Sequence, residues 1–397
     1  MTLADRVNRI QPSQTLAVTA LVAELRHQGK DIIDLGAGEP DFNTPEPVRE
    51  AAIAAINAGF TKYTPASGTL ELKEAICEKL KTENGLEYQP NQILVTCGAK
   101  HAVINALLVL CQKDDEVIIP TPYWTSYVEQ VNFVGARPVL VETDEQTGFK
   151  ITPDQLEEAL TSRTRVLILN SPSNPTGAVY SEEELQALAG VLSRHEVFIL
   201  SDEIYEKILY DGRRHHSLAQ WPDLKPRCIV VNGASKAFAM TGWRIGYLAA
   251  EEEIVKAALK IQSHSTSNPC SISQKASVAA LRGGDRLVAP MLAAFQERRD
   301  FLFERLQQLP GFRCSKPGGA FYMFPDVTHW FGAEHDGTVL ANNTDFCTFL
   351  LEQAGVALVP GSAFGSERHV RISYATSIEQ LQAAMERVEA ALNRLHV

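Results

Sequence analysis

The sequence lacks the long apolar runs and basic blocks that identify several classes of protein. No stretch approaches the roughly 18 apolar residues that a membrane-spanning helix requires, and Asp5, Arg6 and Arg9 stand where a signal peptide needs an apolar segment. We therefore expect a cytoplasmic protein without a membrane partner. The 37 basic and 48 acidic residues give a net charge of −11. Because the basic residues form no block, nucleic acid is not an expected partner either.

Signatures of disulfide frameworks and metal sites are also missing. The seven cysteines are odd in number and include no Cys-x-x-Cys pair, and neither a His-Glu-x-x-His motif nor a P-loop occurs. His215 and His216 are adjacent, but without further ligands at metal-site spacing this pair predicts a solvent-exposed loop. We predict no metal.

The sequence does contain regular alternation of short apolar runs with amphipathic segments. The 397 residues are 45% hydrophobic and 21% charged, as in a globular enzyme of two or three domains. Alternating strands and helices predict an α/β fold with a mostly parallel sheet between helices. The runs that predict strands are Ile93–Cys97, Glu116–Pro120, Val166–Asn170, Val197–Ser201 and Cys228–Asn232.

Several helix ends are marked by local signals. Thr44 is a candidate N-cap with Pro45 as the first helical residue, and Gly59 is a candidate C-terminal stop. Ser181 and Glu184 form a capping-box pattern that predicts the start of another helix.

The pattern changes after about residue 290, which predicts a second domain. A long charged helix around Glu297–Leu309 is followed by shorter apolar runs at Phe321–Phe324, Val356–Val359 and Val370–Ser373. We predict a large domain over residues 46–290. A smaller α+β domain would combine residues 1–45 with residues 291–397.

Residues with several different chemistries follow the predicted strands. Ligands of an open parallel sheet bind beyond the carboxyl ends of its strands, where this sequence has Gly98-Ala99-Lys100, Asn174, Asp202, Tyr205 and Ser235-Lys236. Small residues at a helix start suit a phosphate group. A lysine amine can condense with an aldehyde, and a carboxylate can keep a pyridine nitrogen protonated. The set therefore suits a phosphorylated pyridine aldehyde.

With these residues the sequence resembles the fold-type I, class I aminotransferases that use pyridoxal 5′-phosphate, and within them the bacterial aspartate aminotransferase branch, some members of which accept prephenate. The resemblance covers nearly the whole chain in order. Its motifs are Gly36-Ala-Gly-Glu-Pro-Asp-Phe42, Lys62-Tyr-Thr-Pro65, Pro122-Tyr-Trp124, Asn174-Pro-Thr-Gly177, Ser201-Asp-Glu-Ile-Tyr205, Gly233-Ala-Ser-Lys-Ala-Phe-Ala-Met-Thr-Gly-Trp-Arg-Ile-Gly246 and Val370-Arg-Ile-Ser373. It implies a large domain with a seven-stranded-type sheet.

The resemblance also implies catalytic roles for residues of these motifs. Lys236 would be the Schiff-base lysine and the base that moves the substrate proton. Asp202 would pair with the pyridinium nitrogen, and Tyr205 and Asn174 would hydrogen-bond the ring oxygen. Trp124 would stack on the ring, and Trp124 and Asn174 would also border the substrate.

Binding roles follow from the same resemblance. The phosphate would be held by Gly98, Ala99, Lys100, Ser235 and Arg244, with Tyr63 reaching it from the second subunit of a homodimer with shared active sites. Arg371 would hold the substrate α-carboxylate through two parallel hydrogen bonds. The Gly36 backbone would close over that carboxylate.

The residue that recognises a second, distal carboxylate is left open. Animal and enteric enzymes use a partner-subunit arginine, and the corresponding stretch Ser263–Cys270 has none. Lys100 is the candidate in the branch that this chain resembles, with an ordinary ion pair as the alternative. His101 and Ser13-Gln14-Thr15 are further candidates for the pocket wall.

The resemblance implies amino transfer between L-aspartate and 2-oxoglutarate, by a ping-pong mechanism through a pyridoxamine form. A prephenate, aromatic or alanine aminotransferase is the close alternative, because prephenate also has two carboxylates. A lyase on the same fold would release ammonia without an acceptor. A cofactor-binding regulator would need a DNA-binding segment, and about 30 residues precede the first motif.

Overall fold

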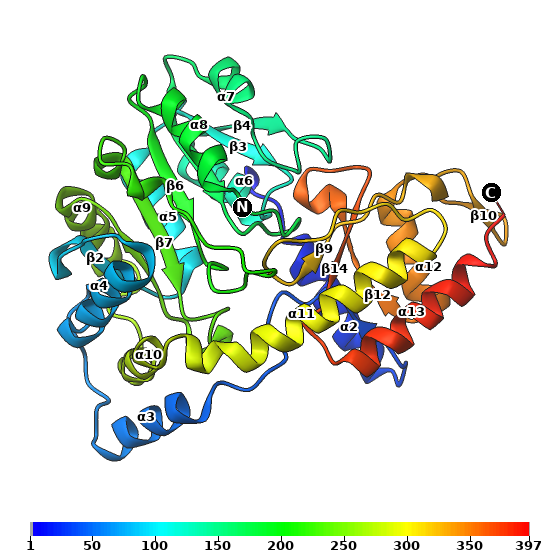
Figure 1. The fold of residues 1–397 in the computed structure, drawn as a ribbon, viewed down its shortest axis with the longest axis horizontal. Coiled ribbons are helices and arrows are strands. Elements are labelled where there is room, and N and C mark those ends of the chain that lie inside the picture. The colour runs from blue at the N-terminus through cyan, green and yellow to red at the C-terminus, as the bar shows by residue number, and fades with distance from the viewer. Residues whose placement is uncertain (1–2, 397) are drawn as a thin grey trace.

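A seven-stranded sheet forms the centre of the larger part of the molecule (Figure 1). The computed structural model describes residues 3–396. The strand order is β2-β8-β7-β6-β5-β3-β4, and all neighbours are parallel except β8, which is antiparallel to β2 and β7. The bounds are β2 Ile93–Thr96, β3 Glu116–Thr121, β4 Arg137–Glu142, β5 Thr164–Asn170, β6 Phe198–Asp202, β7 Cys228–Gly233 and β8 Gly246–Ala249. The predicted α/β class is confirmed.

The five strands expected from the sequence are present with ends shifted by at most two residues, but β4 and β8 were not predicted. Pro138 lies within β4, and proline lacks the N–H that a central strand needs. It is accommodated because β4 is the edge strand. β8 is only four residues long and begins with Gly246, so its apolar run is too short to stand out.

Helices cover both faces of the sheet, as alternating burial along the strands requires. Ile168 of β5 packs with the helices of one face, whereas Leu167 and Leu169 pack with those of the other. The first face carries α5 Ala99–Leu110, α6 Ser126–Val134 and α9 Glu252–Ser263; the second carries α4 Leu70–Asn84, α7 Pro153–Ala159 and α8 Glu182–Leu192. The predicted capping box is confirmed: Ser181 Oγ accepts from Glu184 N, and Glu184 Oε2 accepts from Ser181 N.

The smaller part is built on a three-stranded antiparallel sheet in the order β13-β14-β9. It also holds the parallel pair β1–β12 and the hairpin β10–β11. Its strands are β1 Ile33–Asp34, β9 Tyr322–Met323, β10 Glu334–His335, β11 Thr338–Val339, β12 Val356–Ala357, β13 Val359–Pro360 and β14 Val370–Ser373. Its helices are α2 Gln14–His27, α12 Asn343–Ala354 and α13 Ile378–Leu392.

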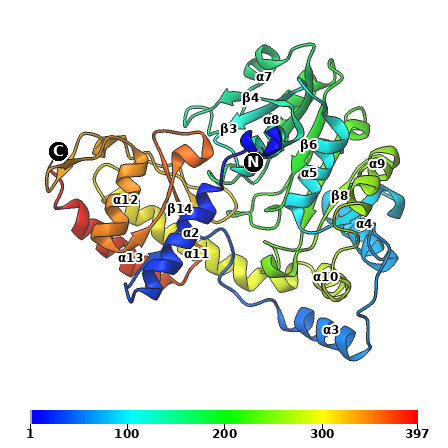
Figure 2. The ribbon, with the colours of Figure 1, turned by 180° about the vertical axis from the view of Figure 1, so that it is seen from behind.

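One long helix joins the two parts. α11 runs over Asp285–Gln308, so it begins before the expected Glu297 and continues through Pro290 (Figure 1). The N-terminal segment also touches both parts: α1, Asp5–Asn8, lies against α6, while α2 lies among the C-terminal elements (Figure 2). Residues 46–290, and residues 1–45 with 291–397, remain our proposal for the two domains, with the boundary inside α11.

α3, Glu46–Asn57, packs on α10, Ser271–Gly283, and extends from the lower edge of the molecule in Figure 1. The expectation that Thr44 caps this helix is wrong. Thr44 Oγ1 instead donates to the Ala239 carbonyl at 2.7 Å and accepts from Trp243 Nε1 at 2.9 Å. Thr44 therefore ties the segment after residue 42 to the segment after Lys236.

The start of α5 packs closely against the first residue of β8. A Cβ added at Gly246 would lie 2.3 Å from the Ala99 backbone nitrogen. The added Cβ would clash with backbone atoms, which cannot move aside as a flexible side chain could.

We predict that Gly246→Ala lowers the free energy of unfolding by about 1–3 kcal/mol, the usual cost of overpacking. Gly190→Ala is the matched control, because a Cβ at Gly190 within α8 meets no atom within 4 Å. The control should stabilise by up to about 1 kcal/mol through helix propensity. Urea unfolding measures both variants, and equal stability of the two would contradict the packing argument.

Candidate active site

A cavity of about 210 Å³ opens where β5, β6 and β7 end. Most of the sequence-predicted site residues line it: Ala99, Lys100, Trp124, Asn174, Asp202, Tyr205, Ser235, Lys236 and Arg244. Six further lining residues were not predicted: Gly38, Tyr127, Asn170, Ile204, Thr241 and Tyr322. The predicted residues Gly36, Gly98 and Arg371 lie directly behind this wall, in contact with its residues.

Lys236 follows β7 and directs its amine toward the loop that carries Gly38. Its Nζ donates a hydrogen bond of 2.6 Å to the Gly38 carbonyl oxygen. Loss of hydration lowers the pKa of Lys236 to about 8, although the charge of Glu39 acts in the opposite direction. The amine is therefore unprotonated far more often near neutral pH than an exposed lysine, and this minority form is available as a nucleophile or base.

Asp202 is the last residue of β6, and it is buried in the wall of the cavity. Tyr127 donates to its Oδ2 at 2.6 Å and the Ile204 amide donates to its Oδ1 at 3.3 Å. Burial nevertheless raises the pKa of Asp202 to about 6, because these hydrogen bonds only partly offset the desolvation. The carboxylate therefore favours a cationic partner inside the cavity.

Tyr205 and Asn174 approach the cavity from the loops after β6 and β5. The Tyr205 hydroxyl lies 2.8 Å from that of Tyr322, and burial raises the pKa of Tyr205 well above its usual value. Asn174 is held at its backbone, where its N–H donates to Asn170 Oδ1 at 2.9 Å. Its own Oδ1 accepts from Arg371 Nη1 at 3.0 Å.

The start of α5 forms a cradle with Arg244. Gly98 has a φ of 84°, and a Cβ there would lie 2.5 Å from Arg244 Nη2, so only glycine admits the guanidinium. Arg244 has the left-handed φ of 55°, and its Nη1 donates to the Thr241 carbonyl at 2.7 Å. The helix N-terminus, the guanidinium and Ser235 line one corner of the cavity, an arrangement that suits an anion.

Among the described residues 3–396, Arg371 on β14 is 2% exposed and forms no ion pair, although the negative charge of Asp34 is near enough to favour its protonated form. Its Nη1 and Nη2 donate to Asn174 Oδ1 and, at 2.6 Å, to the Gly36 carbonyl, while its Nε has no hydrogen-bond partner among these residues. Burial lowers the pKa of Arg371 below its usual value. A buried guanidinium that meets only neutral oxygens provides a site for a carboxylate.

Lys100 and Trp124 stand together at the mouth of the cavity. Lys100 Nζ lies 5.0 Å from the centre of the Trp124 ring, and desolvation together with Arg244 lowers the pKa of Lys100. Lys100 also lines a second cavity, of about 270 Å³, with Ser13 and Gln14. Lys100 makes no ion pair in the described residues 3–396, so the ordinary ion-pair alternative finds no support there.

Three further predicted residues, Tyr63, His101 and Thr15, line neither cavity. The Tyr63 side chain is 93% exposed and does not line the cavity. Ile53 and Ile56 of α3 are exposed apolar residues as well. His101 accepts from the Cys97 N–H through Nδ1 at 3.2 Å and lines neither cavity. The predicted role of Tyr63 involves a second subunit, so the structure of one chain does not bear on it.

A family model described as aminotransferase class I and II matches residues 30–388. The chain belongs to this aminotransferase family. An aspartate aminotransferase of Bacillus subtilis is 50% identical and an aspartate/prephenate aminotransferase of Nitrosomonas europaea is also 50% identical, each over at least 98% of both chains. These matches confirm the resemblance found in the sequence and an enzyme of the aminotransferase type.

Solved structures agree with the family assignment. The fold is similar to that of an aspartate aminotransferase from Rhizobium meliloti, with a TM-score of 0.96, 48% identity and full coverage of both chains. It is also similar to a Thermus thermophilus aspartate aminotransferase determined with maleate, with a TM-score of 0.93, 44% identity and coverage of 98% and 100%.

The aminotransferase site contains two tyrosines that sequence reasoning missed. Tyr127 positions Asp202, and Tyr322 contacts both Tyr205 and, at 4.5 Å from its ring centre, the Arg371 guanidinium. Tyr322 lies in an apolar run and Tyr127 lies near the start of a predicted amphipathic segment, and in both settings an aromatic residue suggests only packing. The one available signal for Tyr127 was its position three residues after Trp124, on the first turn of a helix that starts at the sheet edge.

The adjacent histidines differ from the expectation of a solvent-exposed loop. His215 is enclosed behind β6, with its Nε2 2.9 Å from Glu203 Oε2. Glu203, Glu206 and His215 each place one potential metal-ligand atom within 4.8 Å of the other two. Lys79 forms an ion pair with Glu206, so cations already balance this acidic group.

We predict that Asp202→Asn stabilises the cofactor-free protein and weakens cofactor binding. A carboxyl with a raised folded-state pKa stabilises the fold at low pH and loses this contribution as the pH rises between about 4 and 6. The neutral amide should therefore increase the free energy of unfolding at pH 8 by about 1–3 kcal/mol, and by less at pH 5. Chemical denaturation at both pH values measures this, and a destabilised variant at pH 8 would contradict the assigned cause.

Proposed function

We propose that this chain is a pyridoxal-phosphate-dependent aminotransferase that moves an amino group between L-aspartate and 2-oxoglutarate. The observation that carries the proposal is that one cavity joins the Lys236 amine, the buried Asp202 carboxylate and an anion cradle, and that behind it the Arg371 guanidinium donates only to neutral oxygens. The names of the relatives support the choice of L-aspartate.

The donor set of the cavity fits pyridoxal phosphate. The start of α5, Ser235 and Arg244 would hold the phosphate, and Asp202 would face the pyridine nitrogen. Trp124 would cover the ring, and Tyr205 and Asn174 would hydrogen-bond its oxygen. When bound, the cofactor supplies an aldehyde that condenses with amines and a ring that withdraws electrons from the attached carbon.

Residues of this chain would move the substrate proton and stabilise the charge on the cofactor. Lys236, with a pKa of about 8, could accept the proton from the substrate Cα and deliver it to the aldehyde-derived carbon of the cofactor, because its amine is partly neutral near neutral pH. The Gly38 carbonyl keeps the amine directed into the cavity. Asp202 would hold a positive charge on the pyridine nitrogen, which in turn would lower the pKa of the carboxyl.

Arg371 would bind the substrate α-carboxylate. Both of its bonded nitrogens meet neutral acceptors, Asn174 and Gly36, and the free Nε adds a donor without a partner. A carboxylate would supply the missing negative charge, and a planar guanidinium can bind it with two parallel hydrogen bonds.

Lys100 would hold the distal carboxylate of a dicarboxylic substrate. It lies at the cavity mouth without an ion-pair partner in the described part of the chain, and its position over Trp124 keeps the amine beside the cofactor site. The Thermus thermophilus relative was determined with maleate, which is a dicarboxylate. Ser13 and Gln14 would close the same region from the N-terminal segment.

A homodimer would complete the site. Ile53, Ile56, Tyr63 and Leu70, which lie on and after α3, have exposed side chains. Burying them against a second copy would bring Tyr63 to the phosphate of that copy. The absence of a membrane-spanning type of helix among residues 3–396 leaves the cytoplasmic location as our proposal from the sequence.

Prephenate as the amino acceptor is the second candidate. Relatives named aspartate/prephenate aminotransferase match at the same level of identity as those named aspartate aminotransferase. Because prephenate has two carboxylates, Arg371 and Lys100 would serve it equally well.

The direct test supplies purified enzyme, loaded with pyridoxal phosphate, with L-aspartate and 2-oxoglutarate. We expect equimolar oxaloacetate and L-glutamate, with prephenate tested in place of 2-oxoglutarate. Lys100→Ala should lower kcat/KM for L-aspartate about tenfold or more, the contribution of a charge-assisted hydrogen bond, and that for L-alanine much less.

Lys113→Ala, at an exposed lysine just beyond α5, is the matched control and should leave both values unchanged. Formation of ammonia and a keto acid without an acceptor would indicate a lyase and refute the proposal. An equal loss for L-aspartate and L-alanine would remove Lys100 from substrate recognition.

A further inference from the structure

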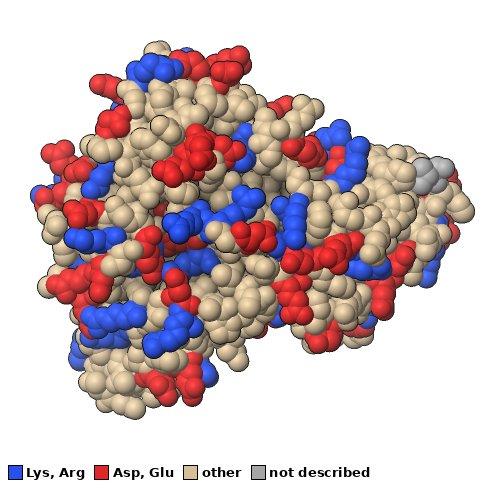
Figure 3. Space-filling view, in the orientation of Figure 1, with Lys and Arg blue, Asp and Glu red and all other residues tan. Residues whose placement is uncertain are grey.

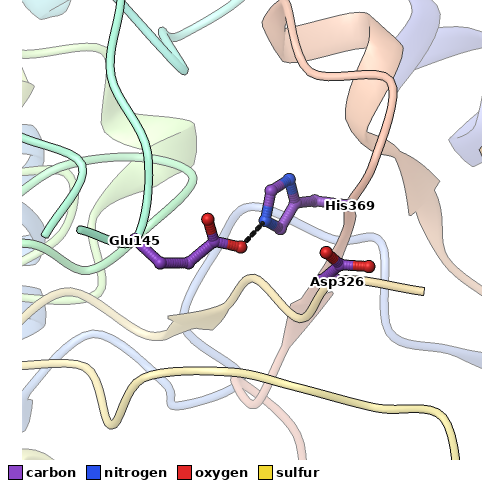
Figure 4. A group of neighbouring side chains, drawn as sticks. All are labelled: Glu145, Asp326 and His369. Carbon is purple, nitrogen blue, oxygen red and sulfur yellow. Dashed lines mark hydrogen bonds and ion pairs between the residues drawn. The ribbon is translucent and has the colours of Figure 1, made fainter. Parts of the chain in front are cut away.

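A loop of the larger part reaches the strand that carries Arg371. Glu145 lies between β4 and α7, and its Oε1 is 2.6 Å from Nε2 of His369 (Figure 4). His369 is 3% exposed, and its Nδ1 lies 2.7 Å from Ser366 Oγ. Since Arg371 follows two residues later on β14, this contact acts on the backbone that positions the guanidinium.

Phe149 adds an aromatic contact beside the Glu145 contact. Its ring meets His369 edge-on at 5.3 Å and Phe324 edge-on at 5.9 Å. Phe324 in turn stacks on His369 with centres 4.8 Å apart and planes 10° apart. The loop therefore holds His369 from two directions, through a carboxylate and through a ring.

Backbone hydrogen bonds in the loop between β4 and α7 fix the conformation of Phe149. Phe149 has a φ of 58°, which is unfavourable for a non-glycine residue. Its N–H donates to the Asp144 carbonyl at 2.7 Å, and the Asp144 carboxylate accepts from the amides of Gln146 and Thr147. These contacts maintain a conformation that costs free energy in isolation.

The aromatic contact extends to Arg371 itself. Phe364 lies edge-on to Phe324 at 6.2 Å, and the Arg371 guanidinium carbon lies 4.8 Å from the centre of the Phe364 ring. Phe149, Phe324, Phe364 and Arg371 thus form a continuous series from the larger part to the guanidinium. Glu145 and Phe149 do not line the cavity, so they can act only through these neighbours.

We propose that Glu145 and Phe149 are positioning residues, which hold β14 so that Arg371 stays aligned with Asn174 and Gly36 for the substrate carboxylate. This inference rests on the proposed role of Arg371 in substrate binding. The loop would therefore set substrate affinity without touching the substrate.

A metal ion is a less suitable explanation for this cluster. Asp326 lies beside Glu145 and His369 (Figure 4). However, Arg368 Nη2 lies 2.6 Å and Arg313 Nη2 lies 3.2 Å from Asp326 Oδ2, and Thr328 bonds the other oxygen. Two guanidinium groups already balance the carboxylate that a cation would need.

The first test measures steady-state kinetics of Glu145→Ala in the loaded enzyme. We expect KM for L-aspartate to rise about three- to tenfold, the effect of one net hydrogen bond, with kcat changed less than twofold. Glu145→Gln keeps an acceptor for His369 and should restore part of the affinity. Glu142→Ala is the control, because the Glu142 side chain makes no hydrogen bond or ion pair in the described part of the chain.

A double-mutant cycle with His369→Gln tests whether the two residues act as a pair. If they do, the double variant should have nearly the KM of the worse single variant instead of the product of both effects. Hydrogen exchange in the loaded enzyme without substrate should be faster at Val370–Ser373 in Glu145→Ala and unchanged in Glu142→Ala.

Unchanged KM or unchanged exchange at β14 in Glu145→Ala would overturn the positioning role. Arg371→Lys separates this outcome from a failure of the proposed function. If Arg371→Lys leaves KM for L-aspartate unchanged, the role of Arg371 itself is refuted, whereas a large increase for Arg371→Lys with no effect of Glu145→Ala refutes only the role of the loop.

Discussion

The arrangement of the site depends on one buried guanidinium. Arg371 joins the loop after β5, through Asn174, to the segment that follows β1, through Gly36. These segments are far apart in the sequence and belong to different parts of the fold. Burying a cation among neutral oxygens is unfavourable unless an anion completes the set. The fold therefore holds a positive charge that no hydrogen-bonded anion neutralises, at the position where a substrate carboxylate would bind.

Two ionisable groups of the cavity are also destabilised in their charged forms. Burial shifts the pKa of Lys236 down to about 8 and that of Asp202 up to about 6, so desolvation disfavours the charged form of each. A cofactor with a cationic nitrogen and an anionic phosphate would restore balance to Asp202 and to the cradle at α5. Such a site reduces stability in favour of binding, a common compromise at functional sites.

Much of this organisation could be predicted because residues at the ends of parallel strands must meet at one edge. Lys236, Asp202 and Asn174 were located in this way. Tyr127 and Tyr322 could not be found, because their importance depends on which hydroxyls they approach in space. Thr44 was assigned to a helix cap from local pattern alone, although a tertiary contact with Ala239 determines its role.

The most direct measurement is the mass of the Lys236-containing peptide after the loaded enzyme is reduced with borohydride. The account predicts a pyridoxyl-phosphate group on Lys236, its loss when L-aspartate is added before reduction, and its return when 2-oxoglutarate follows. Labelling of another lysine would contradict the assigned site. Labelling of Lys236 that is insensitive to L-aspartate would retain the cofactor site and contradict the proposed donor.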